Sequence, residues 1–205
     1  ERIIQNANPA FNVEKIYTDS YKQVSTTGGE SYPEAHDDMY RKVEQGCLIT
    51  NYIGHGGEIG LTSEKLLGLQ DVNSWTNFDA LSLFMTITCE FPRLDDHKRV
   101  SAGEQLALNG NGGAIALIST TRVVGAYTAV DLNRKVFETA FDRPNNEPKT
   151  LGEIVRTAKN QLTNGDTRLQ FSLIGDPAVR LAMPYYNMQV NEVNGTLASA
   201  GGLDT

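Results

Sequence analysis

The chain has 205 residues and a formal net charge of -7 at pH 7. A chain of this length can form one well-buried domain, in which roughly 70% of the unfolded surface is removed on folding. The acidic balance argues against nucleic acid as a partner, since nucleic-acid binding requires clustered Lys and Arg. No apolar stretch reaches the length of a membrane span, and residue 1 does not begin a signal peptide.

The first third of the chain predicts a helix that leads into a strand. Residues 1–6 are typical of the end of a helix already under way, so we expect the sequence to be an interior piece of a longer protein. Val13–Tyr17 is a short strand candidate. A helix is predicted from Ser31, because a capping Ser is followed three residues later by Glu34, with a proline between them. Gly46 ends this helix.

Three short apolar runs predict the centre of the fold. Short, nearly continuous apolar runs bounded by turn residues are typical of strands buried on both faces, as in parallel sheets. We therefore expect an α/β fold with a mostly parallel sheet flanked by helices. The predicted strands are Cys47–Ile53, Leu81–Thr88 and Ala114–Ile118. The predicted helices in the second half are Glu104–Leu108, Ala126–Phe141 and Leu151–Leu162.

Two further segments complete the organisation. Residues 72–78, which carry the only Trp, are expected to form a surface connection. A strand or bend is expected just before Gly175-Asp176-Pro177. Pro184 then marks a boundary, and Asn187–Val193 alternates like a strand that enters a hairpin turn. The sequence thus predicts the C-terminal part of an α/β domain over residues 1–183 and the truncated start of an all-β, immunoglobulin-like sandwich over 184–205.

Reactive side chains follow two of the predicted strands. His55 comes just after the first strand and Cys89 just after the second, so both are expected at the carboxyl edge of the sheet, where open α/β sheets hold their sites. His55 has the chemistry of a general base and acid, and the N–H groups of Gly56 and Cys89 are candidate oxyanion donors. The alternative is a buried cysteine near an unrelated loop histidine. Cys47, at the opposite sheet edge, is predicted to be a small core residue without a disulfide.

Other candidate sites are weaker. Residues 36–38 (His-Asp-Asp) and 95–97 (Asp-Asp-His) mix metal-ligand types, but neither has a partner at zinc-site spacing, so solvated charge is the better interpretation. Gly110–Gly113 precedes a strand rather than a helix, which argues against a phosphate-binding loop. We predict no metal site.

The two strand ends also resemble a known family. Gly54-His55-Gly56-Gly57 and Thr88-Cys89-Glu90-Phe91 look like the corresponding segments of gingipains, which are caspase-like cysteine peptidases. Within that family, further segments resemble the PorU-type sortase of the type IX secretion system, and the similarity covers about residues 1–183. These segments are Arg93 with Asp95-Asp96, Arg99 and Ser101–Glu104; Gly112–Leu117 with Thr120–Arg122; and Leu173–Leu181.

The resemblance implies a reaction and a place in the cell. Such sortases act at the bacterial cell surface, associated with the outer membrane and its secretion components. They remove the C-terminal signal domain of secreted cargo proteins and pass the cargo to an amine of anionic lipopolysaccharide. Cys89 would be the nucleophile and His55 the acid and base. No cofactor is implied, and a structural calcium is compatible with the resemblance. The implied substrate-binding residues are Gly57, Glu90, Thr121, Arg122 and Val123.

The sequence departs from the family at some points. Leu61 stands where relatives often carry an aromatic residue, and Arg122 does not suit a basic substrate side chain. The family's carboxylate that orients the histidine, and its first strands, are expected upstream of residue 1. Two alternatives stay open: an endopeptidase in which water replaces the amine, and a non-catalytic interaction module of the same fold.

Overall fold

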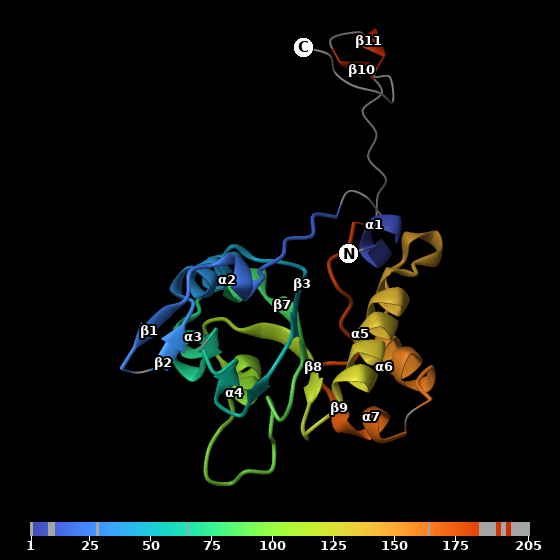
Figure 1. The fold of residues 1–205 in the computed structure, drawn as a ribbon. Coiled ribbons are helices and arrows are strands. Elements are labelled where there is room, and N and C mark those ends of the chain that lie inside the picture. The colour runs from blue at the N-terminus through green and yellow to red at the C-terminus, as the bar shows by residue number, and fades with distance from the viewer. Residues whose placement is uncertain are drawn as a thin grey trace.

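A central four-stranded sheet organises the protein (Figure 1). The computed structural model describes residues 2–7, 11–27, 29–64, 66–163, 165–184, 192–193 and 196–197. The strand order is β3-β7-β8-β9, with β3, β7 and β8 parallel and β9 antiparallel to β8. The mostly parallel α/β sheet expected from the sequence is confirmed. The strands are β3 (Ile49–Ile53), β7 (Ser82–Ile87), β8 (Ala114–Thr120) and β9 (Phe171–Gly175).

One face of the sheet is covered by α5, α6 and the short helices beside them (Figure 1). Leu83, Met85 and Ile87 point from β7 to this side, where they pack with Leu132 and Ile154. The alternation of side chains along a strand sends every second residue to the same face. The helices of this layer are α1 (Arg2–Ala7), α5 (Ala126–Phe141), α6 (Leu151–Asn160) and α7 (Gly165–Gln170).

Three other helices cover the opposite face. Phe84 points from β7 into this second cluster, and its ring centroid lies 5.7 Å from that of Trp75. The expected surface position of residues 72–78 is wrong for Trp75, which is fully buried, and for Val72, whereas Phe78 is 62% exposed. Val72 and Trp75, at α3 and its C-terminal end, point into the core. The helices of this layer are α2 (Pro33–Gln45), α3 (Leu69–Ser74) and α4 (Ala102–Leu108).

Short strands and 3₁₀ turns complete the described fold. The predicted strand at Val13–Tyr17 is wrong, since the segment pairs with no strand among the described residues and Tyr17 is 63% exposed. The two-stranded sheet is β1 (Val24–Thr26) with β2 (Gly29–Ser31), and the three-stranded one is β4 (Gly56–Gly57), β5 (Gly60–Leu61) and β6 (Leu67–Gly68). The 3₁₀ turns are η1 (Thr18–Ser20), η2 (Phe78–Ala80) and η3 (Pro144–Asn146).

The C-terminal segment is described only in part. β10 (Glu192–Val193) and β11 (Thr196–Leu197) pair antiparallel, whereas the turn predicted between them and most of 184–205 lie outside the described residues. The all-β domain therefore stays a prediction.

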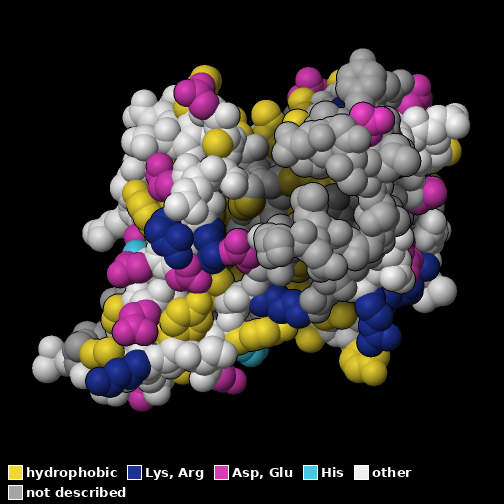
Figure 2. Space-filling view, turned by 90° about the horizontal axis from the view of Figure 1, so that it is seen from above, with side chains coloured by type: hydrophobic (Ala, Val, Ile, Leu, Met, Phe, Trp, Pro, Cys, Tyr) yellow, Lys and Arg dark blue, Asp and Glu magenta, His cyan; other side chains and the backbone are white. Residues whose placement is uncertain are grey.

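Two general features concern the surface and the helices. On the face seen in Figure 2, the Lys and Arg side chains of described residues lie among Asp and Glu side chains, so charge is mixed rather than segregated there. Across the described parts of the chain, none of the helices has both the length and the apolar character needed to cross a membrane.

Candidate active site

The parallel pairing of β3 with β7 brings His55 and Cys89 to one edge of the sheet. Ile53 is the register partner of Ile87, and each reactive residue lies two positions further along its strand. The pairing continues one step beyond the strands, because the Gly54 N–H donates to the carbonyl oxygen of Ile87 at 3.2 Å. The two chain segments thus leave the sheet together, in the same direction.

Cys89 lies at a tight backbone turn. It is half-buried, and its thiol faces the carbonyl oxygen of Val124 with Sγ 4.0 Å away. Glu90, the next residue, has a φ of 47°, in the left-handed region that non-glycine residues rarely adopt. Such strained residues persist only where the surroundings hold them, and they concentrate at functional sites. The strain here changes the chain direction directly after the thiol.

The segment that carries His55 is held through its backbone. The carbonyl oxygen of His55 accepts hydrogen bonds from the N–H of Thr62 at 2.9 Å and from Tyr52 Oη at 2.6 Å. Burial, with a smaller contribution from Glu64, raises the pKa of Tyr52 to about 12, so this donor keeps its proton at ordinary pH. The imidazole itself is exposed. Tyr52 thereby fixes the backbone of His55 and leaves its imidazole free of this contact.

The backbone of Gly56 lies beside the cysteine segment. It pairs with Leu61 across the β4–β5 hairpin, next to the hydrogen-bonded pair of His55 and Thr62. Hydrogen-bonded and non-bonded pairs alternate along an antiparallel ladder, so the Gly56 N–H points away from β5. The Gly56 N–H is therefore directed to a group outside the hairpin.

The two segments touch at Gly56. A Cβ atom there would lie 2.7 Å from Thr88 Oγ1 and 3.0 Å from the carbonyl oxygen of Gly60, so no larger residue fits without movement. Thr88 Oγ1 is buried and has no hydrogen-bond partner among the described residues. Gly57 differs, because a Cβ atom there would meet nothing within 4 Å.

An ion pair joins the same two segments from outside. Glu58, in the β4–β5 turn, accepts from Arg93 Nη1 at 2.7 Å, and Arg99 Nε lies 3.6 Å from its other oxygen. Glu58 also raises the pKa of Arg93. Sequence reasoning missed both Tyr52, which looked like part of an apolar run, and the Glu58–Arg93 pair. No local pattern marks an ion pair that spans 35 residues.

The predicted substrate-binding residues after β8 lie on the same side. Arg122 makes two hydrogen bonds to Asp95, at 2.8 and 3.2 Å, which lower the pKa of that carboxyl. Arg122 therefore links the loop after β8 to the loop after Cys89, and its charge is balanced. Thr121 is half-buried, while Val123 is 64% exposed beside Val124.

The weaker clusters take structural positions. His36 bonds to Asp71 at 2.9 Å and to Asp37 at 3.0 Å. The described residues contain no group of three or more His, Cys, Asp or Glu side chains placed to hold a metal ion. Cys47 and Cys89 are both free thiols, and Cys47 is half-buried, with its Sγ 3.1 Å from Thr50 Oγ1. Full core burial of Cys47 is therefore not observed.

Comparison with known proteins gives the family. The sequence profile of peptidase family C25 matches residues 1–182. No curated protein matches the chain. One similar solved structure is the Arg-specific cysteine proteinase gingipain R (RgpB), with a TM-score of 0.63 and 18% sequence identity; the match covers 71% of this chain and 36% of that one. Another is the complex of Porphyromonas gingivalis RgpB pro- and mature domains, with a TM-score of 0.61 and 19% sequence identity; the match covers 71% of this chain and 37% of that one. The chain thus spans little more than a third of these structures, and the likeness shows the fold.

A third structure, described as a protease, gives a TM-score of 0.58 with 19% identity over 69% of this chain and 37% of that one. The profile match extends over nearly all of the described α/β domain, including both strand ends that carry His55 and Cys89. The chain belongs to peptidase family C25, the gingipain family.

Proposed function

We propose that this chain is part of the catalytic domain of a cysteine peptidase in which Cys89 is the nucleophile and His55 the general acid and base. The observation that carries the proposal is the parallel register of Ile53 with Ile87, from which both residues follow at equal distance along neighbouring strands. The strained Glu90 and the close approach of Gly56 to Thr88 support it, since both shape the space around the thiol.

The chemistry proceeds in two stages. The imidazole of His55 takes the thiol proton as Sγ of Cys89 attacks the carbonyl carbon of a peptide bond, and the N–H groups of Gly56 and Cys89 bind the resulting oxyanion. The intermediate collapses when the imidazolium gives its proton to the leaving amine, which departs. A thioester on Cys89 remains, and a second nucleophile then attacks it and releases the thiol.

The identity of that second nucleophile separates a peptidase from a sortase. We favour an amine of anionic lipopolysaccharide, so that the chain removes the C-terminal signal domain of secreted cargo and couples the cargo to the cell surface. The support is the resemblance of three sets of residues to the sortase branch: Arg93 with Asp95-Asp96, Arg99 and Ser101–Glu104; Gly112–Leu117 with Thr120–Arg122; and Leu173–Leu181. Outer-membrane association, the secretion partners and a structural calcium belong to this finer proposal.

Selective alkylation tests the nucleophile, and Cys47 serves as the internal control. Both thiols are free and half-buried, so exposure alone does not separate them. We expect iodoacetamide, followed by peptide mass mapping, to modify Cys89 faster than Cys47 in mildly acid solution, and His55→Ala to remove the difference. Equal rates for the two thiols, unchanged in His55→Ala, would support the non-catalytic module instead.

The mass of the new cargo terminus tests the acceptor. Transfer to an amine leaves an amide whose mass includes the acceptor, whereas hydrolysis leaves a free carboxylate. We expect the amide in the presence of lipopolysaccharide, and neither product with Cys89→Ala. A free carboxylate as the sole product would replace the sortase by the endopeptidase.

A further inference from the structure

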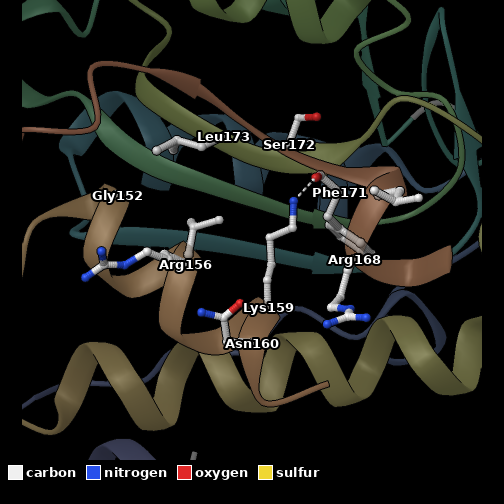
Figure 3. A pocket seen from close by; sticks show the side chains of 10 residues that line it. Gly152, Arg156, Lys159, Asn160, Arg168, Phe171, Ser172 and Leu173 are labelled. Atoms are coloured by element: carbon white, nitrogen blue, oxygen red, sulfur yellow. Dashed lines mark hydrogen bonds between the residues drawn. The ribbon is translucent and has the colours of Figure 1, made fainter. Parts of the chain in front are cut away.

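A basic cavity of about 530 Å³ lies on the far side of the sheet from the α2 layer, between α6 and β9 (Figure 3). Arg156 and Arg168 lie on either side of Lys159, whose Nζ reaches across from α6 to the carbonyl oxygen of Phe171 at 2.8 Å. The described residues that line the cavity include these three cations and no carboxylate. The cavity therefore favours an anionic occupant.

Among the described residues the cations have no direct ion pair, although the charge of Glu153, one turn before Arg156 on α6, interacts with that of Arg156. Neither Arg156 nor Arg168 has an ion pair with any carboxylate in the described ranges of the chain. Lys159 is half-buried, and within the described part of the chain its Nζ bonds to the neutral carbonyl oxygen of Phe171. Burial lowers its pKa, which shows that the charged form is disfavoured there. A carboxylate entering the cavity would relieve this cost.

One long side of the cavity is an open strand edge. β9 pairs with β8 and with no other described strand. The Thr121 N–H donates to the carbonyl oxygen of Gln170 at 3.0 Å, so these two residues form a hydrogen-bonded pair. Hydrogen-bonded and non-bonded pairs alternate along an antiparallel ladder. The backbone N–H and C=O of Ser172 therefore point toward β8, and those of Phe171 and Leu173 point outward. The hydrogen bond from Lys159 to the Phe171 carbonyl oxygen agrees with this outward orientation. The N–H and C=O of Leu173 thus lie on the open edge.

We propose that this edge and the basic cavity bind an extended acidic segment of a partner protein, which adds to the sheet as a fifth strand beside β9. Backbone hydrogen bonds to Leu173 supply the pairing, as in other cases of strand addition. Alternate side chains of the added strand, about 6.7 Å apart, point toward α6. Carboxylates at these positions meet Arg156 and Lys159, which are neighbours on one helix face about 5–6 Å apart.

The charge of the edge selects this occupant over a second copy of the chain. Two copies paired through β9 would bring two sets of Arg156, Lys159 and Arg168 together, and like charges facing one another disfavour the pairing. The charges favour pairing with an acidic strand, because a planar guanidinium group such as that of Arg156 or Arg168 can bind a carboxylate through two parallel hydrogen bonds. The side chain of Ser172 points away from α6 (Figure 3), so acidic residues are needed only at alternate positions.

A labelled peptide tests the charge requirement. The probe is a capped, fluorescein-labelled peptide of alternating Val and Glu, and binding to the full chain is measured by fluorescence anisotropy at low salt. We expect binding that weakens at least about tenfold in Arg156→Glu and in Arg168→Glu. The control is Lys22→Glu, which changes the charge equally at an exposed position beside β1 and should bind as the wild type does. Absence of binding to the wild type, or equal loss in Lys22→Glu, would overturn the proposal.

Backbone methylation of the probe tests the strand pairing. In an added strand, every second residue points its backbone N–H toward β9, and the side chains of these residues lie on one face of the sheet. Because Val and Glu alternate in the probe, the amides that face β9 are either all those of Val or all those of Glu. We expect N-methylation of one set to abolish binding and of the other set to leave it within about threefold. The same effect from both sets would overturn strand addition.

The site is independent of the proposed peptidase chemistry. The same measurements in Cys89→Ala exclude any contribution from cleavage, and equal probe affinity in that variant and the wild type is expected. Failure of the alkylation test at Cys89 would leave this binding result unchanged, so the two proposals fail separately.

Discussion

At the scale of single residues, the site depends on how closely two loops approach. Gly56 leaves room for Thr88 Oγ1, whereas Gly57, its neighbour, faces open space. Both were predicted from the sequence to take part in the site, one as an oxyanion donor and one as a substrate contact. In the structure only Gly56 is packed too closely to accept a side chain, so the two glycines form a matched pair for mutation.

We expect Gly56→Ala to destabilise the chain by about 1–3 kcal/mol, the usual cost of overpacking, and to reduce the labelling of Cys89 by a peptide acyloxymethyl ketone more than tenfold. Gly57→Ala should change stability by less than about 0.5 kcal/mol. Urea denaturation and the labelling rate measure the two effects. Equal stability of the two variants would contradict the close approach described at Gly56.

At the scale of elements, the β4–β5 hairpin and the segment after β7 behave as one unit. Glu58 accepts from Arg93 at 2.7 Å, and its carbonyl oxygen accepts from the Ala102 N–H at 2.7 Å, where α4 begins. The Ser101 cap starts α4 with the capping box predicted from the sequence. A single hairpin residue thus holds the cysteine segment and the first turn of a helix in place.

We expect Glu58→Gln to reduce the labelling rate of Cys89 by roughly tenfold to a hundredfold, because small displacements of reacting groups have effects of that size. The control is Glu64→Gln, which removes the same charge after the same hairpin, from a residue that has no ion pair among the described residues. Hydrogen exchange of the 54–62 amides should rise in Glu58→Gln only. Matching rates in the two variants would show that the ion pair has no positioning role.

At the scale of the whole molecule, the sheet divides the core into two layers. The α5–α6 layer and the α2–α3–α4 layer each form a separate apolar cluster. In the second layer, His36 on α2 bonds to Asp71 on α3 at 2.9 Å. Burial acts to lower the pKa of His36, but the hydrogen bonds to Asp71 and Asp37 outweigh it, so the pKa is raised above 6.5. This contact makes the stability of the layer depend on pH.

A pKa that is higher in the folded state favours folding when the group is protonated. The contribution of His36 is therefore fully present below about pH 6.5 and is lost as the pH rises through the raised value. We expect His36→Gln to lower the free energy of unfolding by on the order of 1 kcal/mol at pH 5.5 and by less at pH 8.5. Urea titrations at both pH values measure this, with the exposed His97 replaced by Gln as control. A deficit that grows with pH would contradict the assignment.

Local signals explain which elements were predictable. The helix Ala126–Phe141 was predicted with its observed bounds, and the parallel strands were found within two residues of their ends, because apolar runs, caps and glycines act over a few neighbouring residues. Trp75 was misplaced since burial depends on Phe84 and Tyr40, which are distant in sequence. Val13–Tyr17 failed for a related reason: a strand requires a partner, and the described residues place none beside it.

The sequence by itself determined the α/β class, the three parallel strands and the placement of His55 and Cys89 after two of them, because strand patterns and turn residues are properties of short segments. Only the tertiary structure decided the rest of the site: the contact of Gly56 with Thr88, the Glu58–Arg93 and Arg122–Asp95 pairs, and the open basic edge of β9. The three contacts join segments about 27 to 35 residues apart, and the open edge exists because no second described strand pairs with β9. The periodicity of a single stretch of chain does not encode which distant groups will meet.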